Sequence, residues 1–320
     1  MRFWVLLVFV FLSSSGALAQ QCSSEGPMCP EDACCSKYGY CGFDEAHCGG
    51  DCVSNCHLPG NISNLINQTT FDEMFKHRSD ASCNTSTFYI YEAFMEAAVH
   101  FGGFGRTGDN DTRKREIAAF LAQTAYATAG GQEDSEDPYS WGYCYIKEQN
   151  ATLDNYCVES TTWPCVEGKQ YYGRGPIQLR YNTYYGPAGL DLDYALLNDP
   201  DELARDSVMS FKSALWYWMN CHLEKPSCHN VMTNQWEPNS DDVQAGRVAG
   251  FGLTTNIIDG ENECGHGSDN RVEKRIGFYK AFCDLIGVTY GENLDCYTQK
   301  PYGSSPVSKI YKAIYKIFME

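Results

Sequence analysis

Thiol groups are the first feature of this sequence that could do chemistry. The chain contains 17 Cys, and eight of them crowd into residues 22–56: Cys22, Cys29, Cys34, Cys35, Cys41, Cys48, Cys52 and Cys56. Thiols at this density either bind zinc or form disulfides. A shortage of His and an apolar leader that indicates export both favour disulfides in an oxidising compartment. We expect no metal and no cofactor.

The leader is the apolar run from Phe3 to Leu12, followed by small residues and Ala17-Leu18-Ala19. This pattern is typical of a secretory signal at residues 1–19. No later stretch approaches the roughly 20 apolar residues of a membrane span. We expect an exported protein, extracellular or vacuolar, without a membrane partner. Candidate glycan sites are the Asn-x-Ser/Thr sequons at Asn61, Asn67, Asn84, Asn110 and Asn150.

Composition sets the size of the core and the class of partner. The chain has 320 residues, 43% of them hydrophobic, which is enough for one large core or two unequal modules. Its 24 Lys and Arg against 41 Asp and Glu give a net charge of −17. Such a surface repels phosphate backbones, so nucleic acid is not expected as a partner.

The elements that must position any site change character along the chain. Residues 20–56 contain almost no aliphatic side chains and need cross-links to fold. After Phe71 the apolar residues follow helical periodicity, with a helix expected from Arg113 to the Gly130-Gly131 stop and others at Asp206 to Asn220 and Asn270 to Ile286. Gly- and Tyr-rich stretches between them predict long loops.

The N-terminal cysteine spacing, C-x6-C-x4-CC-x5-C-x6-C-x3-C-x3-C, resembles the hevein domain, a chitin-binding module of plant lectins and chitinases. Ser36-Lys37-Tyr38-Gly39-Tyr40-Cys41-Gly42 after the Cys34-Cys35 pair makes the match specific. The resemblance implies that three aromatic positions stack on sugar faces and that a Ser bonds the acetamide. Those positions are Tyr38, Tyr40, His47 and Ser36. The alternative is that the rings only shield disulfides.

Residues 71–303 resemble the catalytic domain of plant family 19 chitinases. Long matching runs carry the resemblance: Gly108 to Gln123, Trp141-Gly142-Tyr143-Cys144, Tyr171 to Leu179, Ala245 to Ile258 and Gly277 to Lys280. The resemblance implies a mainly α, lysozyme-like fold with long loops, joined to the small disulfide-rich hevein-like module. It also places Trp163 and Gln178 in the cleft.

Family 19 enzymes invert the sugar bond with two carboxyl groups, a general acid and a base that activates water. The resemblance maps the base to Glu148. It maps the acid, which precedes a Gly-Gly pair, to Ala127 in Tyr126-Ala127-Thr128. Alanine has no titratable proton, although it stabilises a helix end.

Other cleft positions depart from the family as well. Arg180 stands where the family has a Ser that holds the water, and Asp259 replaces a water-placing Asn. Glu263 and Arg275 match an ion pair near the acid. We expect Arg180 to pair with Asp259 or with Glu148.

The nine Cys that remain after the first eight predict further cross-links. The resemblance implies the pairs Cys83-Cys144, Cys157-Cys165 and Cys264-Cys296. Cys221 and Cys228 lack a family counterpart, and their spacing around Pro226 suggests an added bridge. Cys283, on an apolar stripe, is expected to be a buried inert thiol.

These observations predict a signal at 1–19, a hevein-like domain at 20–56, a linker at 57–70, a chitinase-like domain at 71–303 and a basic amphipathic extension at 304–320, read as a vacuolar address or a docked helix. We interpret the chain as a defence lectin that binds chitin and N-acetylglucosamine oligomers without cutting them. Agglutination by it would need a second sugar site or self-association. The alternatives are an endochitinase whose acid has moved to Glu133 or Asp134, and a storage protein.

Overall fold

The computed structural model describes residues 22–23, 29, 34–42, 47, 52–54, 62–83, 85–130, 135–149, 151, 156–222 and 224–303. The expected leader and C-terminal extension lie outside these residues, as do Glu133, Asp134 and the sequons at Asn61, Asn84 and Asn150. Contacts divide the chain into two compact units, residues 1–59 and 60–320. In the described part no helix is long and apolar enough to cross a membrane.

The first unit is built on a small antiparallel sheet. Its strands are β1 (Cys34–Ser36), β2 (Cys41–Gly42) and β3 (Cys52–Ser54), in the order β2-β1-β3. Disulfides join Cys22 to Cys35 and Cys29 to Cys41. The sulfur atoms of Cys22, Cys29 and Cys35 lie within 4.8 Å of one another, but sulfur in a disulfide is not the thiolate that binds a metal.

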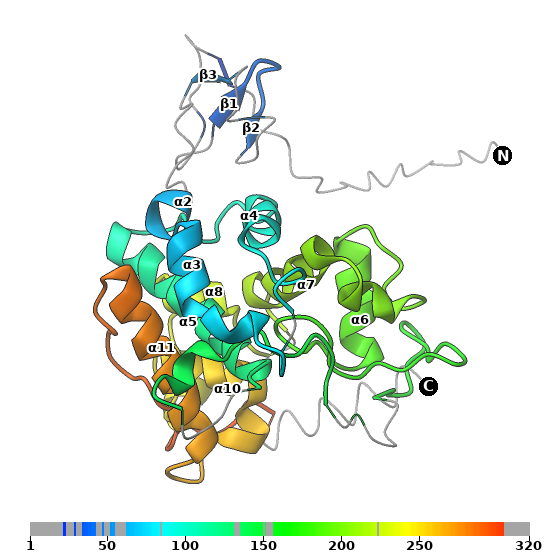
Figure 1. Ribbon diagram of the computed structural model, residues 1–320, viewed down its shortest axis with the longest axis vertical. Helices are drawn as coiled ribbons and strands as arrows, with labels where there is room; N and C mark the ends of the chain where they lie inside the picture. Colours follow the sequence, from blue (N-terminus) through cyan, green and yellow to red (C-terminus); the bar gives the residue numbers. More distant parts are fainter. Residues whose placement is uncertain are drawn as a thin grey trace, which may run out of the picture. The chain divides into compact units, whose positions relative to one another are not determined.

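The second unit is mainly helical, which confirms the expected fold class (Figure 1). Its α-helices are α2 (Ile62–Leu65), α3 (Gln68–Met74), α4 (Tyr91–Val99), α5 (Asn110–Ala127), α6 (Asn182–Asp191), α7 (Ser207–Met219), α8 (Cys228–Met232), α9 (Ser240–Gln244), α10 (Phe251–Glu263) and α11 (Asn270–Ile286). Short 3-10 helices lie at η1 (Lys76–Ser79), η2 (Pro138–Ser140) and η3 (Pro200–Ala204).

Side-chain caps fix where the long helices begin. The carboxylate of Asp109 accepts the amide of Thr112 at 2.8 Å, so α5 starts at Asn110 rather than at the expected Arg113. Asp206 caps α7 in the same way. Gly287 ends α11 in the left-handed conformation, with φ 70°, which glycine adopts without a steric penalty.

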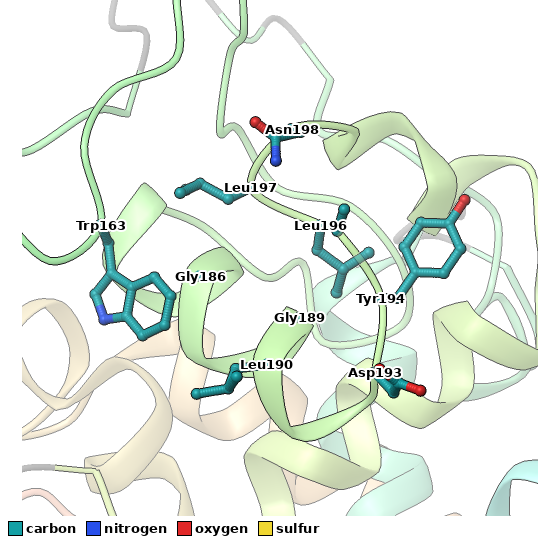
Figure 2. Close-up of a pocket in the computed structure, with 10 residues that line it drawn as sticks. Trp163, Gly186, Gly189, Leu190, Asp193, Tyr194, Leu196, Leu197 and Asn198 are labelled. Atoms are coloured by element: carbon teal, nitrogen blue, oxygen red, sulfur yellow. The ribbon is translucent and has the colours of Figure 1, made fainter.

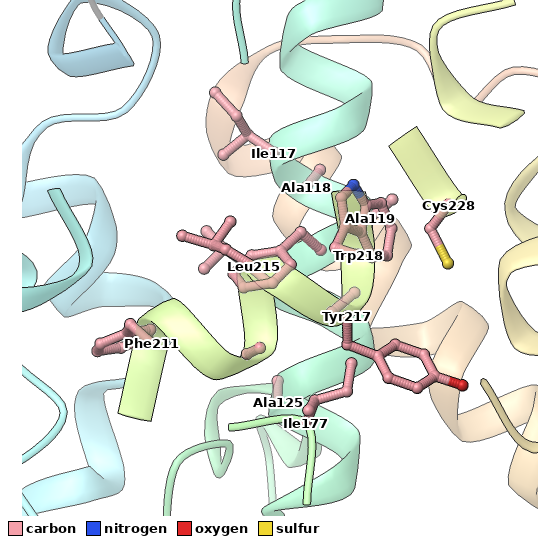
Figure 3. Packing of buried hydrophobic residues seen from close by; sticks show 14 of the residues in the cluster. Ile117, Ala118, Ala119, Ala125, Ile177, Phe211, Leu215, Tyr217, Trp218 and Cys228 are labelled. Carbon is pink, nitrogen blue, oxygen red and sulfur yellow. The ribbon is translucent and has the colours of Figure 1, made fainter. Parts of the chain in front are cut away.

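Helix α5 runs through the core. Every residue from Glu116 to Ala125 is buried, so this helix is covered on all sides. Helix α11 packs along it, and α7 contributes Phe211, Leu215 and Trp218 to the same cluster (Figure 3). The end of α5 is therefore anchored by the core.

The expectation of a linker at 57–70 is wrong for residues 62–70. Residues 62–70 form α2 and the start of α3, and Ile62 and Ile66 are fully buried in the main core. The sequons and the nearby Pro-Gly pair suggested a linker, but two buried aliphatic side chains tie this segment to the second unit.

Disulfides Cys83-Cys144, Cys157-Cys165 and Cys264-Cys296 occur in the second unit. The expected Cys221-Cys228 bridge does not form, because Cys221 is exposed whereas Cys228 is buried at the start of α8. Burial raises the pKa of the Cys228 thiol and keeps it protonated. Cys283 is a free buried thiol whose pKa burial raises to about 12.

Candidate functional site

Glu148 is the most heavily bonded carboxylate of the candidate site. Its Oε1 accepts the Tyr156 hydroxyl at 2.8 Å and lies 3.1 Å from Nη2 of Arg180. Its Oε2 accepts the Gly173 amide at 2.9 Å and Nε of Arg180 at 3.2 Å. Arg180 therefore pairs with Glu148, one of the two partners expected from the sequence.

The backbone around Glu148 is fixed by the loop 171–179. The amide of Glu148 donates to the carbonyl of Gly173 at 2.8 Å, which closes a reciprocal pair with the bond from Gly173 to the side chain. A Cβ on Gly173 would lie 2.8 Å from Gln178 Oε1, so only glycine fits there. Gln178 has φ 53° and donates to the carbonyls of Gly175 and Ile146, which makes it a support of this loop.

Ala127 is the last residue of α5, half-buried, and has a charged cluster beside it. Arg275 donates to both oxygens of Glu263, at 2.7 and 2.8 Å, and to Gln123 at 2.6 Å. Burial alone would lower the pKa of Arg275, but the bonds to Glu263 outweigh it and raise that pKa. The ion pair implied by the family resemblance is thus present without a carboxyl group at residue 127.

Asp259 belongs to this same cluster and not to the Arg180 side. Its Oδ2 lies 3.9 Å from Nη2 of Arg275, and its Oδ1 accepts Asn262 Nδ2 at 2.6 Å. The expectation that Arg180 pairs with Asp259 is wrong. Tyr126 covers Arg275 with its ring at 4.2 Å, and burial raises the pKa of Tyr126 to about 12.

The two sides of the site are joined through Thr128. Its carbonyl accepts the amides of Cys144 and Tyr145, at 3.0 and 3.1 Å, and its hydroxyl accepts the amide of Tyr143 at 2.9 Å. The end of α5 is thereby tied to the segment that carries Glu148.

Trp163 lines a pocket of about 350 Å³ beside α6 (Figure 2). Its indole packs on Gly186, where a Cβ would lie 2.2 Å from the ring. The other lining residues are Gly189, Leu190, Asp193, Tyr194, Ala195, Leu196, Leu197 and Asn198. None of the hydrogen-bonding partners of Glu148 lines this pocket, although Asn182, which follows Tyr181, donates to the Trp163 carbonyl at 2.6 Å.

In the first unit, Tyr38 and Tyr40 are 73% and 42% exposed. They flank Gly39, whose φ of 76° turns the chain so that its amide reaches the carbonyl of Ser36. Ser36 is buried, and its hydroxyl oxygen accepts the Tyr40 amide at 3.3 Å. His47 is half-buried. The tyrosine rings are thus available for stacking, while Ser36 also holds the turn.

Sequence reasoning missed Tyr156 and Tyr181. Tyr156 donates to Glu148, and Tyr181 presents a 40% exposed ring whose centroid is 5.4 Å from that of Tyr156. Both have positive φ, 51° and 69°, which is uncommon for aromatic residues. Lone aromatic residues in a loop show no periodicity, so only the richness in Tyr hinted at them.

Comparisons with known proteins find a matching family for each of the two units. Residues 65–296 match the family described as Chitinase class I, and residues 20–56 match Chitin recognition protein. An endochitinase of Persea americana is 52% identical over 309 residues, covering 94% of each chain. A basic endochitinase of Vitis vinifera is 51% identical over 308 residues, covering 95% of this chain and 98% of that one. Chitinase C of Streptomyces griseus is 32% identical with a TM-score of 0.60, over 72% of this chain and 97% of that structure.

The expectation that the chain is not an enzyme is wrong by these comparisons. It rested on the single missing carboxyl group at Ala127, whereas relatives that share about half of all residues over nearly the full length are endochitinases. The disulfides indicate a protein of the secretory pathway.

Proposed function

This chain belongs to the class I chitinase family, and on that basis we propose that it is an endochitinase of low turnover with a relocated general acid. Its substrate is chitin and oligomers of N-acetylglucosamine, held in addition by the N-terminal module. A part in defence against organisms that contain chitin follows from this substrate.

The observation that best supports the proposal is how firmly the Glu148 carboxylate is held. Its four hydrogen-bonding contacts fix it on the segment that Thr128 ties to the end of α5. Two of these contacts come from the Arg180 guanidinium, at 3.1 and 3.2 Å. Inverting hydrolysis places such a base on one side of the sugar and a proton donor on the other.

The proton donor is the part that has moved, since Ala127 carries none. Glu133 and Asp134 follow the α5 terminus closely in the chain. Of the two carboxyl groups around Arg275, Glu263 is held by two bonds from it, whereas Asp259 is 31% exposed and lies 3.9 Å from that cation. Glu133, Asp134 and Asp259 are therefore the donors to test. Because a well-placed general acid contributes about 10²- to 10⁴-fold, a substitute in poorer geometry gives slow turnover.

The deciding experiment incubates purified protein with chitohexaose and follows shorter oligomers by mass spectrometry and the anomeric form by NMR. We expect slow release of products with inverted configuration, abolished by Glu148→Gln. The amide variants of Glu133, Asp134 and Asp259, made singly, identify the donor as the one whose loss stops cleavage. Absence of any shorter oligomer at high enzyme concentration, with binding intact, would overturn the proposal.

For the N-terminal module, we propose that Tyr38 and Tyr40 hold chitin by stacking on sugar faces. Their exposure, 73% and 42%, in a unit that matches Chitin recognition protein supports this role. Ser36 and His47 complete the proposed sugar site. Anchoring raises the local concentration of polymer at the second unit.

A further inference from the structure

Glu148 has no acceptor position left for water. A carboxylate offers about four lone-pair sites. Here they meet the Tyr156 hydroxyl, the Gly173 amide, and Nε and Nη2 of Arg180, at 2.8 to 3.2 Å. A base in this state is held in position, but it must lose a donor before it can take a proton.

The three donor residues differ in how easily they can leave. Gly173 is a backbone donor in a reciprocal pair with Glu148. Tyr156 is a neutral phenol whose pKa is raised by burial and by its bond to Glu148, so it stays a donor. Arg180 carries a long side chain that is 40% exposed, against 16% for Glu148.

The guanidinium also lies beside an aromatic ring. While it bonds Glu148, its central carbon is 5.9 Å from the centre of the Tyr156 ring, within the range of a cation–π contact. Because the long Arg180 side chain is 40% exposed, the guanidinium can leave Glu148 toward solvent.

We infer that Arg180 is a positioning residue that acts through Glu148 and limits turnover. This inference rests on the proposed function. In the free protein the guanidinium occupies the acceptor positions of the base. In a productive complex the guanidinium moves off Glu148. A water oxygen then attacks the anomeric carbon, and the proton of that water passes to Glu148. The glycosidic bond breaks, and its leaving oxygen takes a proton from the relocated acid.

Arg180 is the cation that faces Glu148. Arg180 and the Tyr156 hydroxyl contact the carboxylate directly, while the nearby cations Lys147 and Arg174 are both paired with Asp201. Arg180 is thus the one unshared cation at Glu148 within the described residues. Removing its guanidinium leaves two acceptor positions of the carboxylate open to water.

The test compares Arg180→Met, which keeps the stem without the charge, with Arg180→Lys, which keeps a charge without the two-pronged contact. We expect kcat on chitohexaose to rise about tenfold in Arg180→Met, the equivalent of one charge-assisted hydrogen bond, with KM little changed. The kcat of Arg180→Lys should lie between those of the wild-type protein and Arg180→Met, because one ammonium group does not reproduce both guanidinium contacts. Arg205→Met, which breaks an exposed ion pair with Asp199, is the matched control and should leave kcat and KM unchanged.

Each variant is also made in the Ala127→Glu background, where the acid is supplied. If the wild-type protein cleaves nothing, the proposed function is wrong. The Arg180 inference is then decided by comparing Ala127→Glu with the double variant Ala127→Glu, Arg180→Met. An unchanged or lower kcat in folded Arg180→Met would overturn the inference, whichever background shows it.

Discussion

Arg275 of α11 and Glu263 of α10 form a buried two-bond ion pair, at 2.7 and 2.8 Å. Arg275 also bonds Gln123 on α5, four residues before Ala127. The charged surroundings that suit an acid at residue 127 are therefore intact.

Restoring an acid at residue 127 should raise turnover, and Arg180 and Asp259, which affect where the attacking water can bind, should limit the gain. The triple change Ala127→Glu, Arg180→Ser, Asp259→Asn is expected to hydrolyse chitohexaose faster than Ala127→Glu alone. The reason is that Arg180 fills the acceptor sites of Glu148 and that a carboxylate at residue 259 cannot donate to water. Initial rates under saturating substrate measure the difference. Equal rates would show that the water site is already competent.

Retention on chitin should depend on the two exposed rings of the first unit. Tyr38→Ala with Tyr40→Ala is expected to abolish binding to a chitin column, because each ring offers one stacking face. Val53→Ala, at an equally exposed apolar side chain of the same unit, serves as the control and should bind normally. Undiminished retention of the double variant would move chitin binding to the second unit.

Stability should fall in acid through His222. Burial, more than the opposing bond to the Tyr217 carbonyl, lowers the pKa of His222 from 6.5 to about 4. The unfolded chain thus binds more protons between these values, so the free energy of unfolding declines as pH drops from about 6.5 to about 4 and then levels off, a loss of about 3 kcal/mol.

Urea unfolding of wild-type protein and His222→Gln at pH 7.5 and pH 4.5 measures this contribution. Glutamine can still donate to the Tyr217 carbonyl but does not titrate. The decline attributable to His222 should be missing from the variant, and equal declines in the two proteins would contradict the assignment.

The contact between Gly186 and Trp163 should tolerate no side chain. Gly186→Ala places a Cβ 2.2 Å from the indole and is expected to cost about 1 to 3 kcal/mol while displacing Trp163. Urea unfolding and tryptophan fluorescence report the two effects. Leu190→Ala, at a side chain that is 71% exposed in the same pocket, should be neutral. A stable variant with unchanged fluorescence would show that the indole can shift freely.

The sequence predicted the helical class and the positions of α5, α7 and α11, because these helices combine apolar periodicity with Asp caps. It gave no bounds for the other helices of the second unit, which are α2, α3, α4, α6, α8, α9 and α10. It also suggested the Arg180–Glu148 pair as one of two options, since a cation in a carboxylate-lined site must find a counter-charge. The choice between Glu148 and Asp259 required the fold, which places Asp259 beside Arg275.

Two errors have identifiable physical causes. The Cys221-Cys228 bridge was expected because the two residues lie close along the chain. In the fold Cys221 is exposed to solvent, whereas Cys228 is buried. The expected loss of activity gave the change at Ala127 more weight than the match over the rest of the chain. The similar proteins that are endochitinases contradict that expectation.

The close approach of Gly130 to Cys144 has a consequence for engineering. A Cβ on Gly130 would lie 2.2 Å from the Cys144 sulfur, and that sulfur is itself held by Cys83. With the carbonyl of Thr128 bonded to the same segment, residue 127 and Glu148 sit on one stiff frame. Their spacing is therefore a property of the backbone and survives changes in side chains. A side chain introduced at residue 127 is therefore expected to keep a fixed separation from Glu148 without any change to the connecting backbone.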